Sequence, residues 1–173
     1  MKKIVFLEGL PGVGKTTIIN RIREMNLNSI KLVDEILIDA TEGDKQSVWI
    51  NNDIKKITKY DDGIIIIDRG PISTLSYNET KDIISYNNEL DEVYAFFNKY
   101  KYIYNDSITY YLKRKNENYY IPFNDFSNPY GSIENQKILE KVTLHNCKKM
   151  CNNLKIIDYD FDKIEEVINE IIN

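Results

Sequence analysis

The segment Gly9–Thr16 constrains this chain more than any other. It reads Gly-Leu-Pro-Gly-Val-Gly-Lys-Thr and fits the pattern G-x-x-x-x-G-K-[ST] without a gap. A short apolar run, Lys3–Leu7, precedes it, and apolar residues at helical spacing follow from Lys15 to about Met25. Strand, glycine-rich loop and helix in this order are the opening of a βαβ unit. The segment therefore predicts a loop that binds phosphate at the start of a helix.

The residues of this loop have separate expected roles. The glycines let backbone N–H groups point at phosphate oxygens, and the helix N-terminus adds its positive dipole end. Lys15 is expected to reach the β- and γ-phosphates of a nucleotide, and the Thr16 hydroxyl to bind Mg²⁺. The predicted nucleotide-binding residues are Gly9, Gly12, Val13, Gly14, Lys15 and Thr16.

Short apolar runs alternate with helical periodicity along the rest of the chain. Further strands are predicted at Ile30–Val33, Ile64–Ile67, Ser107–Leu112 and Leu154–Ile157. Helices are predicted over about 15–25, 44–60, 73–101 (in one or two pieces), 138–150 and 164–172. This alternation predicts an α/β fold with a parallel sheet and helices on both faces. Because no repeat or linker divides the 173 residues, we expect a single domain.

The segment 113–132 loses the periodic pattern. Charged residues, Asn, aromatic residues and two prolines replace it, which is typical of a loop or a lid over a site. Its basic cluster, Lys113-Arg114-Lys115, has two interpretations. It is a solvated strand end, or a part of the lid in which Arg114 stabilises charge on a transferred phosphoryl group.

Asp68 and Arg69 follow the most apolar run of the sequence, Ile64–Ile67. In a doubly wound sheet, ligands bind at the carboxyl ends of the strands, so this pair is expected beside the phosphate loop. A carboxylate at that position can hold Mg²⁺ directly or through water, and an arginine can bind an anionic group. We therefore predict that Asp68 binds the metal and that Arg69 binds substrate.

Composition excludes several classes of protein. The formal net charge is −4 and the isoelectric point is about 5.2, which argues against binding to polymeric nucleic acid. No apolar run approaches the ~20 residues that span a bilayer, and the apolar stretch after Met1-Lys2-Lys3 ends at Glu8 without a cleavage pattern. We expect a cytoplasmic protein with no membrane partner.

The two cysteines, Cys147 and Cys151, lie near the single histidine, His145. A disulfide between residues four apart on a helix has poor geometry, and one histidine with two thiols does not complete a zinc site. We expect buried free thiols on a helix, in a reducing compartment.

The phosphate loop together with Asp68–Asn78 resembles the thymidylate kinases and the related deoxynucleoside kinases. Thymidylate kinases carry Asp-Arg-Tyr, then Ser, then Ala-Tyr-Gln at the spacing of Asp68-Arg69, Ser73 and Ser76-Tyr77-Asn78. The end of this chain, residues 157–167, is also similar to their last strand, adenine-contacting loop and final helix.

This resemblance implies a five-stranded parallel sheet and transfer of the γ-phosphoryl group of ATP, with Mg²⁺, to a nucleoside or nucleotide. It assigns Arg69 to the acceptor or its phosphate and Asp68 to support of the metal. It also implies that Glu35 approaches the acceptor sugar as a general base, although the neighbouring Asp34 is an alternative. The residues that it assigns to the ATP phosphates and the metal are Gly12, Gly14, Lys15, Thr16 and Thr17.

The chain also departs from the family pattern near the expected acceptor. Gly70 replaces a Tyr or Ser, and Asn78 replaces a Gln close to the base. Trp49 and Tyr77 either line the acceptor pocket, where an aromatic face can stack on a base, or pack in the core. The acceptor, nucleoside or monophosphate, is thus left open, as is the assembly, for which a homodimer is one option.

Two further functions remain as alternatives. The same core could phosphorylate a hydroxylated acceptor that is not a nucleoside. A nucleotide-dependent regulatory protein is the other alternative, but the sequence lacks the Asn-Lys-x-Asp motif of GTPases. In addition, Asp68-Arg-Gly-Pro71 has proline where the Asp-x-x-Gly switch needs glycine.

Overall fold

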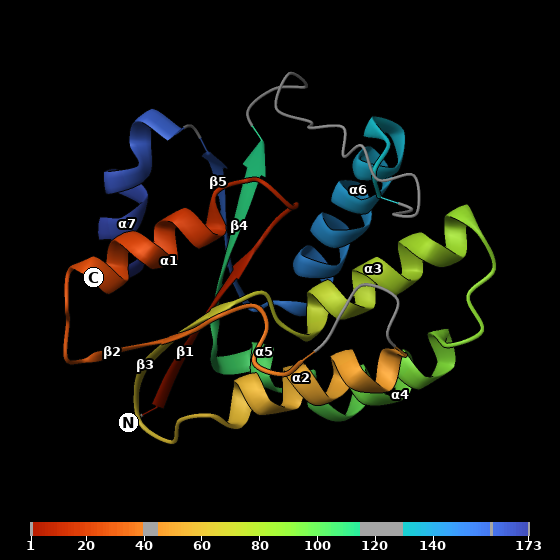
Figure 1. Ribbon diagram of the computed structural model, residues 1–173, viewed down its shortest axis with the longest axis horizontal. Coiled ribbons are helices and arrows are strands. Elements are labelled where there is room, and N and C mark those ends of the chain that lie inside the picture. Colours follow the sequence, from red (N-terminus) through yellow and green to blue (C-terminus); the bar gives the residue numbers. More distant parts are fainter. Residues whose placement is uncertain (1, 40–44, 115–129, 160, 173) are drawn as a thin grey trace.

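A parallel five-stranded sheet forms the centre of the molecule in the computed structural model (Figure 1). The structure describes residues 2–39, 45–114, 130–159 and 161–172. The strand order is β2-β3-β1-β4-β5, and every neighbouring pair is parallel. The strands are β1 Lys2–Glu8, β2 Ile30–Val33, β3 Gly63–Asp68, β4 Ile108–Arg114 and β5 Asn153–Tyr159. The predicted five-stranded parallel sheet is confirmed.

Helices cover both faces of this sheet (Figure 1). Helices α1 (Lys15–Glu24) and α7 (Ile164–Ile172) pack on one face, and α7 is preceded by a short 3₁₀ helix, Phe161–Lys163. The other helices lie on the opposite side, where α4 packs against α2 and α3. They are α2 Gln46–Thr58, α3 Pro71–Ile84, α4 Leu90–Tyr100, α5 Ile103–Asp106 and α6 Ile133–Met150.

The alternation of side chains along β1 assigns residues to the two faces. Val5 and Leu7 belong to the core beneath α1 and α7, whereas Phe6 belongs to the core beneath α2–α6. Because successive side chains of a strand point to opposite faces, Glu8 shares the face of Phe6. A strand covered on both faces reads as a continuous apolar run, which is why β1 and β3 were recognisable in the sequence.

The carboxyl ends of β1, β2 and β3 meet at one edge of the sheet. Leu7 is in register with Asp68, and Val33 is in register with Ile67. The chain leaves β1 into the glycine-rich loop, β2 into Asp34-Glu35, and β3 into Arg69. Three chain segments that are far apart in sequence therefore converge where α/β proteins bind ligands.

Three details differ from the sequence-based expectations. Helix α6 begins at Ile133, ahead of the predicted start near Ile138, whereas α3 begins at Pro71, close to its predicted start, since proline fits a first turn. The four-residue helix α5 was not predicted, because one turn has no periodicity to recognise. Cys151 lies beyond the helix, as the extended C-cap of α6, and is partly exposed, whereas Cys147 is buried; both thiols are free.

In the described part of the chain, no helix is long and apolar enough to cross a membrane. Across the same residues, no group of three or more His, Cys, Asp or Glu side chains is placed to hold a metal ion.

Candidate active site

The glycine-rich loop between β1 and α1 adopts a backbone that needs glycine. Gly9, Gly12 and Gly14 have φ angles of +136°, +72° and +101°. A Cβ on Gly9 would lie 2.5 Å from the carbonyl oxygen of Leu112 on the neighbouring β4, so no larger residue fits there. Val13 anchors the loop by packing into the core beneath α1. The loop therefore has a fixed shape, determined by its glycines and by one apolar contact.

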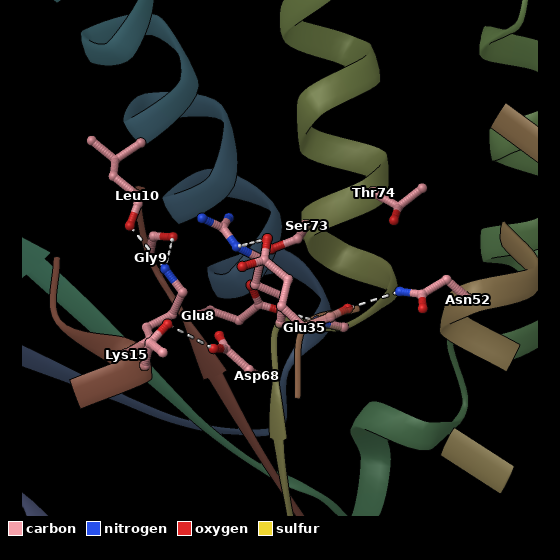
Figure 2. Close-up of polar contacts among 12 residues, drawn as sticks. Glu8, Gly9, Leu10, Lys15, Glu35, Asn52, Asp68, Ser73 and Thr74 are labelled. Carbon is pink, nitrogen blue, oxygen red and sulfur yellow. Dashed lines mark hydrogen bonds and ion pairs between the residues drawn. The ribbon is translucent and has the colours of Figure 1, made fainter. Parts of the chain in front are cut away.

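Lys15 lies folded back into this loop. Its Nζ donates hydrogen bonds to the carbonyl oxygens of Gly9 (3.0 Å) and Leu10 (2.8 Å), and the residue is only 4% exposed (Figure 2). Burial, together with the positive charge of Arg69, lowers the pKa of Lys15 to about 7. The amine is thus held by carbonyl groups that an incoming phosphate can replace.

Asp68 and Thr16 face each other across the start of α1. The Thr16 hydroxyl donates to Oδ2 of Asp68 at 3.4 Å. Burial raises the pKa of Asp68, and its Oδ1 has no hydrogen-bond partner among the described residues. A buried carboxylate oxygen without a partner beside a hydroxyl is a donor set that suits Mg²⁺, which prefers a few protein oxygens together with phosphate and water. The residues present therefore fit the predicted metal.

Glu35 and Arg69 form an ion pair at the same edge of the sheet. Nε of Arg69 lies 2.7 Å from Oε1 of Glu35, off the direction of the N–H bond, so the contact is electrostatic rather than a well-aligned hydrogen bond. Arg69 is 7% exposed at its side chain, and Glu35 is 45% exposed. Burial alone would raise the pKa of Glu35, but Arg69, Lys15 and Lys56 lower it overall, which keeps the carboxylate ionised.

Asp34, the alternative to Glu35, points elsewhere. Its Oδ1 lies 2.6 Å from a guanidinium nitrogen of Arg23 on α1, in an exposed ion pair. Glu35 rather than Asp34 is therefore the acidic residue that the structure brings together with Arg69 and Lys15.

Asn52 of α2 fixes the segment that carries Glu35. Its Nδ2 donates to the carbonyl oxygen of Glu35 at 2.8 Å (Figure 2). Its Oδ1 accepts from the N–H of Leu37 at 2.8 Å. The side chain is buried and thereby ties the chain after β2 to α2. Asn52 was not predicted from the sequence, because an asparagine inside a helix pattern carries no signal of a contact with a distant loop.

Glu8, the last residue of β1, was also missed. It is 0% exposed, and its two carboxylate oxygens accept hydrogen bonds from the N–H of Gly70 (2.9 Å) and from the Ser73 hydroxyl. Burial raises the pKa of Glu8 to about 7, against the lowering effects of Ser73, Arg69, Lys56 and Gly70. The position of Glu8 at the end of an apolar strand could have predicted a contact with α3, because the alternation of side chains along β1 places Glu8 on the face that α3 covers.

The residues predicted for the acceptor lie at different depths. Tyr77 is half-buried, with its ring 5.3 Å from the guanidinium carbon of Arg69 and in edge contact with Tyr130 at 4.7 Å between ring centroids. Trp49 is half-buried on α2. Asn78 is 3% exposed, and hydrogen bonds join its side chain to Gln46, Thr74 and Asn87.

The other predicted residues are exposed or incompletely described. Gly12, Thr16 and Thr17 are exposed on the loop and the first turn of α1. Arg114 is the last residue of β4, and most of the predicted lid, 115–129, lies outside the described residues.

With this geometry established, comparison with solved structures identifies the class of fold: it is that of the P-loop nucleoside and nucleotide kinases. Deoxyadenosine kinase from M. mycoides with bound dATP matches with a TM-score of 0.70 and 15% identity, over 98% of this chain and 99% of that chain. Thymidylate kinase from Candida albicans matches with a TM-score of 0.69 and 17% identity, over 99% of this chain and 89% of that chain. Thymidylate kinase from Ehrlichia chaffeensis matches with a TM-score of 0.63 and 17% identity, over 99% of this chain and 97% of that chain.

Comparisons at the level of sequence gave no further relative. A scan against protein-family models found no match, and a search of curated proteins found none. The predicted resemblance is therefore confirmed as a resemblance of fold.

Proposed function

We propose that this protein transfers the γ-phosphoryl group of ATP, with Mg²⁺, to a nucleoside or nucleoside monophosphate. The observation that carries the proposal is the convergence of Lys15, Asp68, Arg69 and Glu35 at one edge of the sheet beside the phosphate loop. Phosphoryl transfer needs positioned charge more than covalent chemistry, and these four side chains supply both signs of charge at close range. The fold of the matching kinases is consistent with this chemistry.

Each side chain has a defined task in the proposed reaction. Lys15 exchanges its two carbonyl partners for phosphate oxygens, and the loop N–H groups bind the remaining phosphate charge. Thr16 and Asp68 would hold Mg²⁺, which would supply neutralisation of the phosphate charge. Arg69 orients the acceptor.

Glu35 acts on the acceptor hydroxyl. Its ionised carboxylate removes the hydroxyl proton while the oxygen forms a bond to the γ-phosphorus, the bond to the β-phosphate oxygen breaks, and ADP leaves. Arg69, Lys15 and Lys56 keep Glu35 ionised, so its carboxylate can accept a proton at neutral pH, although the lowered pKa makes it a weaker base than an unpaired glutamate.

The distribution of charge favours a nucleoside over a monophosphate acceptor. A phosphate dianion on the acceptor requires free cations, but Arg69 is already paired with Glu35, and Lys56 is buried 3.3 Å from Asp53. Of the basic residues of the predicted lid, Lys113 lies 3.9 Å from Asp158 and Arg114 is the predicted partner of the transferred phosphoryl group, which leaves Lys115. A nucleoside presents a neutral hydroxyl to the ionised carboxylate of Glu35, so it needs no further cation, whereas a monophosphate does.

A panel of acceptors tests the proposal. Nucleosides, nucleoside monophosphates and non-nucleoside alcohols are each incubated with ATP and Mg²⁺, and ADP release is measured against a blank without acceptor. Release with nucleosides supports the proposed acceptor. Activity only on non-nucleoside alcohols would replace it with the broader phosphotransferase alternative, and nucleotide binding without any transfer would favour the regulatory alternative.

A further inference from the structure

Glu8 is a buried carboxylate that the proposed reaction does not use. It lies at the end of β1, between the phosphate loop and the turn that leads from β3 into α3 (Figure 2). We propose that Glu8 is a positioning residue, which holds the turn Asp68–Ser73 so that Arg69 faces the acceptor. This inference rests on the proposed function, because it concerns the turnover of the same site.

The turn that carries Arg69 has a conformation that its own sequence does not favour. Arg69 has a φ angle of +58°, in the left-handed region that residues with a side chain seldom adopt. A Cβ on the next residue, Gly70, would lie 2.7 Å from the ring of Phe6 and 2.8 Å from the Tyr104 hydroxyl. Such a turn persists only where surrounding contacts hold it.

Four hydrogen bonds from outside the turn supply these contacts. The N–H of Arg69 donates to the carbonyl oxygen of Leu7 at 3.0 Å, and the N–H of Ile72 donates to the Tyr104 hydroxyl at 3.0 Å. Glu8 accepts the other two, one on each carboxylate oxygen, from the N–H of Gly70 and the hydroxyl of Ser73. Of these three partners, Glu8 is the one that accepts from two residues of the turn, Gly70 before α3 and Ser73 within it, so it fixes the direction in which Arg69 leaves β3.

The charge of Glu8 is unfavourable for folding, which argues for a role in the reaction. The groups that face it are Arg69 and Ser73 after β3, Lys56 on α2, Lys15 on α1, Tyr104 on α5, and the two cysteines at the end of α6. Burial nevertheless raises the pKa of Glu8 from 4.5 to about 7. Because the folded state holds the proton more tightly, stability falls as pH rises through this window, and the ionised carboxylate destabilises the fold above pH 7.

The test compares Glu8→Gln with the wild-type protein at pH 8 and saturating ATP. Glutamine keeps the shape and one acceptor, but loses the charge and the second acceptor. We expect turnover to fall by about tenfold or more, the KM for ATP to stay within about twofold, and the melting temperature to be equal to or above that of the wild type. Ser73→Ala, which removes one of the two bonds, should lower turnover in the same direction by a smaller factor.

Asp53→Asn is the matched control, because Asp53 is also a buried carboxylate, on α2, which accepts a hydrogen bond from Thr74 of α3 and is paired with Lys56. It should lower the melting temperature while the folded protein keeps its turnover. A purely structural role for Glu8 predicts the same behaviour for Glu8→Gln.

The pH dependence provides a second measurement. The turnover of the wild type should decline as pH falls below about 7, since protonated Glu8 loses an acceptor, and Glu8→Gln should lack this decline. Wild-type turnover in Glu8→Gln, or a loss that follows the melting temperature, would overturn the positioning role. A wild-type protein that is inactive with every acceptor would instead overturn the proposed function.

Discussion

Arg69 meets Glu35 with 2.7 Å between Nε and Oε1, although 34 positions separate the two residues in the sequence. One follows β3 and the other follows β2, and these strands are neighbours in the sheet. The pair neutralises itself in the absence of substrate. An acceptor hydroxyl that enters between the two side chains would meet a base on one side and a guanidinium group on the other.

Lys15→Ala should reduce turnover by roughly 10²–10³-fold while the fold is kept. The amine donates to the loop carbonyl groups of Gly9 and Leu10, so its removal takes away phosphate charge neutralisation rather than core packing. Steady-state kinetics and a thermal melt check the two parts of this prediction. A variant with near-normal transfer would show that the loop does not bind the nucleotide as proposed.

ATP binding should become weaker as pH rises above about 7. Lys15 has a pKa of about 7 in the free protein, so above this pH the amine is neutral and must take up a proton when it binds phosphate. Calorimetry at pH 8 in two buffers of different ionisation enthalpy measures this uptake. Lys15→Arg, which stays charged, should show no such uptake; equal uptake in both proteins would assign the proton to another group.

Much of this fold was predictable, because a strand that is buried on both faces of the sheet reads as a continuous apolar run in the sequence. The runs Lys3–Leu7 and Ile64–Ile67 became β1 and β3 within a residue or two of the predicted bounds, and the glycine loop followed β1 as expected. The four-residue helix α5 left no such pattern.

The site was only partly predictable, because its parts interact across long sequence separations. Strand ends and the loop motif were enough to predict Lys15 and Asp68 as candidate site residues. The roles of Glu8 and Asn52 depend on contacts with residues 62 and 17 positions away, through hydrogen bonds that no local periodicity encodes. Likewise, the choice between Asp34 and Glu35 came from two ion pairs, Asp34 with Arg23 and Glu35 with Arg69.

Asp68→Asn should abolish most of the additional stabilisation that Mg²⁺ gives to the ATP complex. A ligand that binds only the folded state raises its melting temperature. The Oδ1 of Asp68, which has no hydrogen-bond partner within the described ranges, is the oxygen best placed to contribute to a metal site. Thermal melts with ATP, with and without Mg²⁺, measure the difference. Asp158→Asn, at the exposed end of β5, is the control and should retain the full Mg²⁺ effect.

Asn52→Ala should lower turnover more than it changes ATP binding. Its loss leaves the carbonyl group of Glu35 and the N–H of Leu37 without their partner and frees the segment that carries the base. The neighbouring Asn51 is exposed on the same helix, so Asn51→Ala is a matched control. Equal kinetics for the two variants would mean that the position of Glu35 does not depend on Asn52.

Glu35→Gln should lower turnover by roughly 10²–10⁴-fold, with ATP binding unchanged, if Glu35 is the general base. The glutamine keeps the size of the side chain but cannot accept the proton of the acceptor hydroxyl, and it leaves Arg69 without its counter-charge. Turnover and ATP affinity are measured separately, by acceptor kinetics and by calorimetry.

Asp34→Asn is the control for this variant, because Asp34 is the adjacent carboxylate and is paired with Arg23 at the surface. Its loss removes an exposed ion pair worth about 0–1 kcal/mol of stability, so its turnover should stay close to that of the wild type. The reverse result, with Asp34→Asn inactive and Glu35→Gln active, would transfer the role of base to Asp34. Two mild variants would instead favour a monophosphate acceptor, whose phosphate oxygen is already ionised and needs no base to attack the γ-phosphorus.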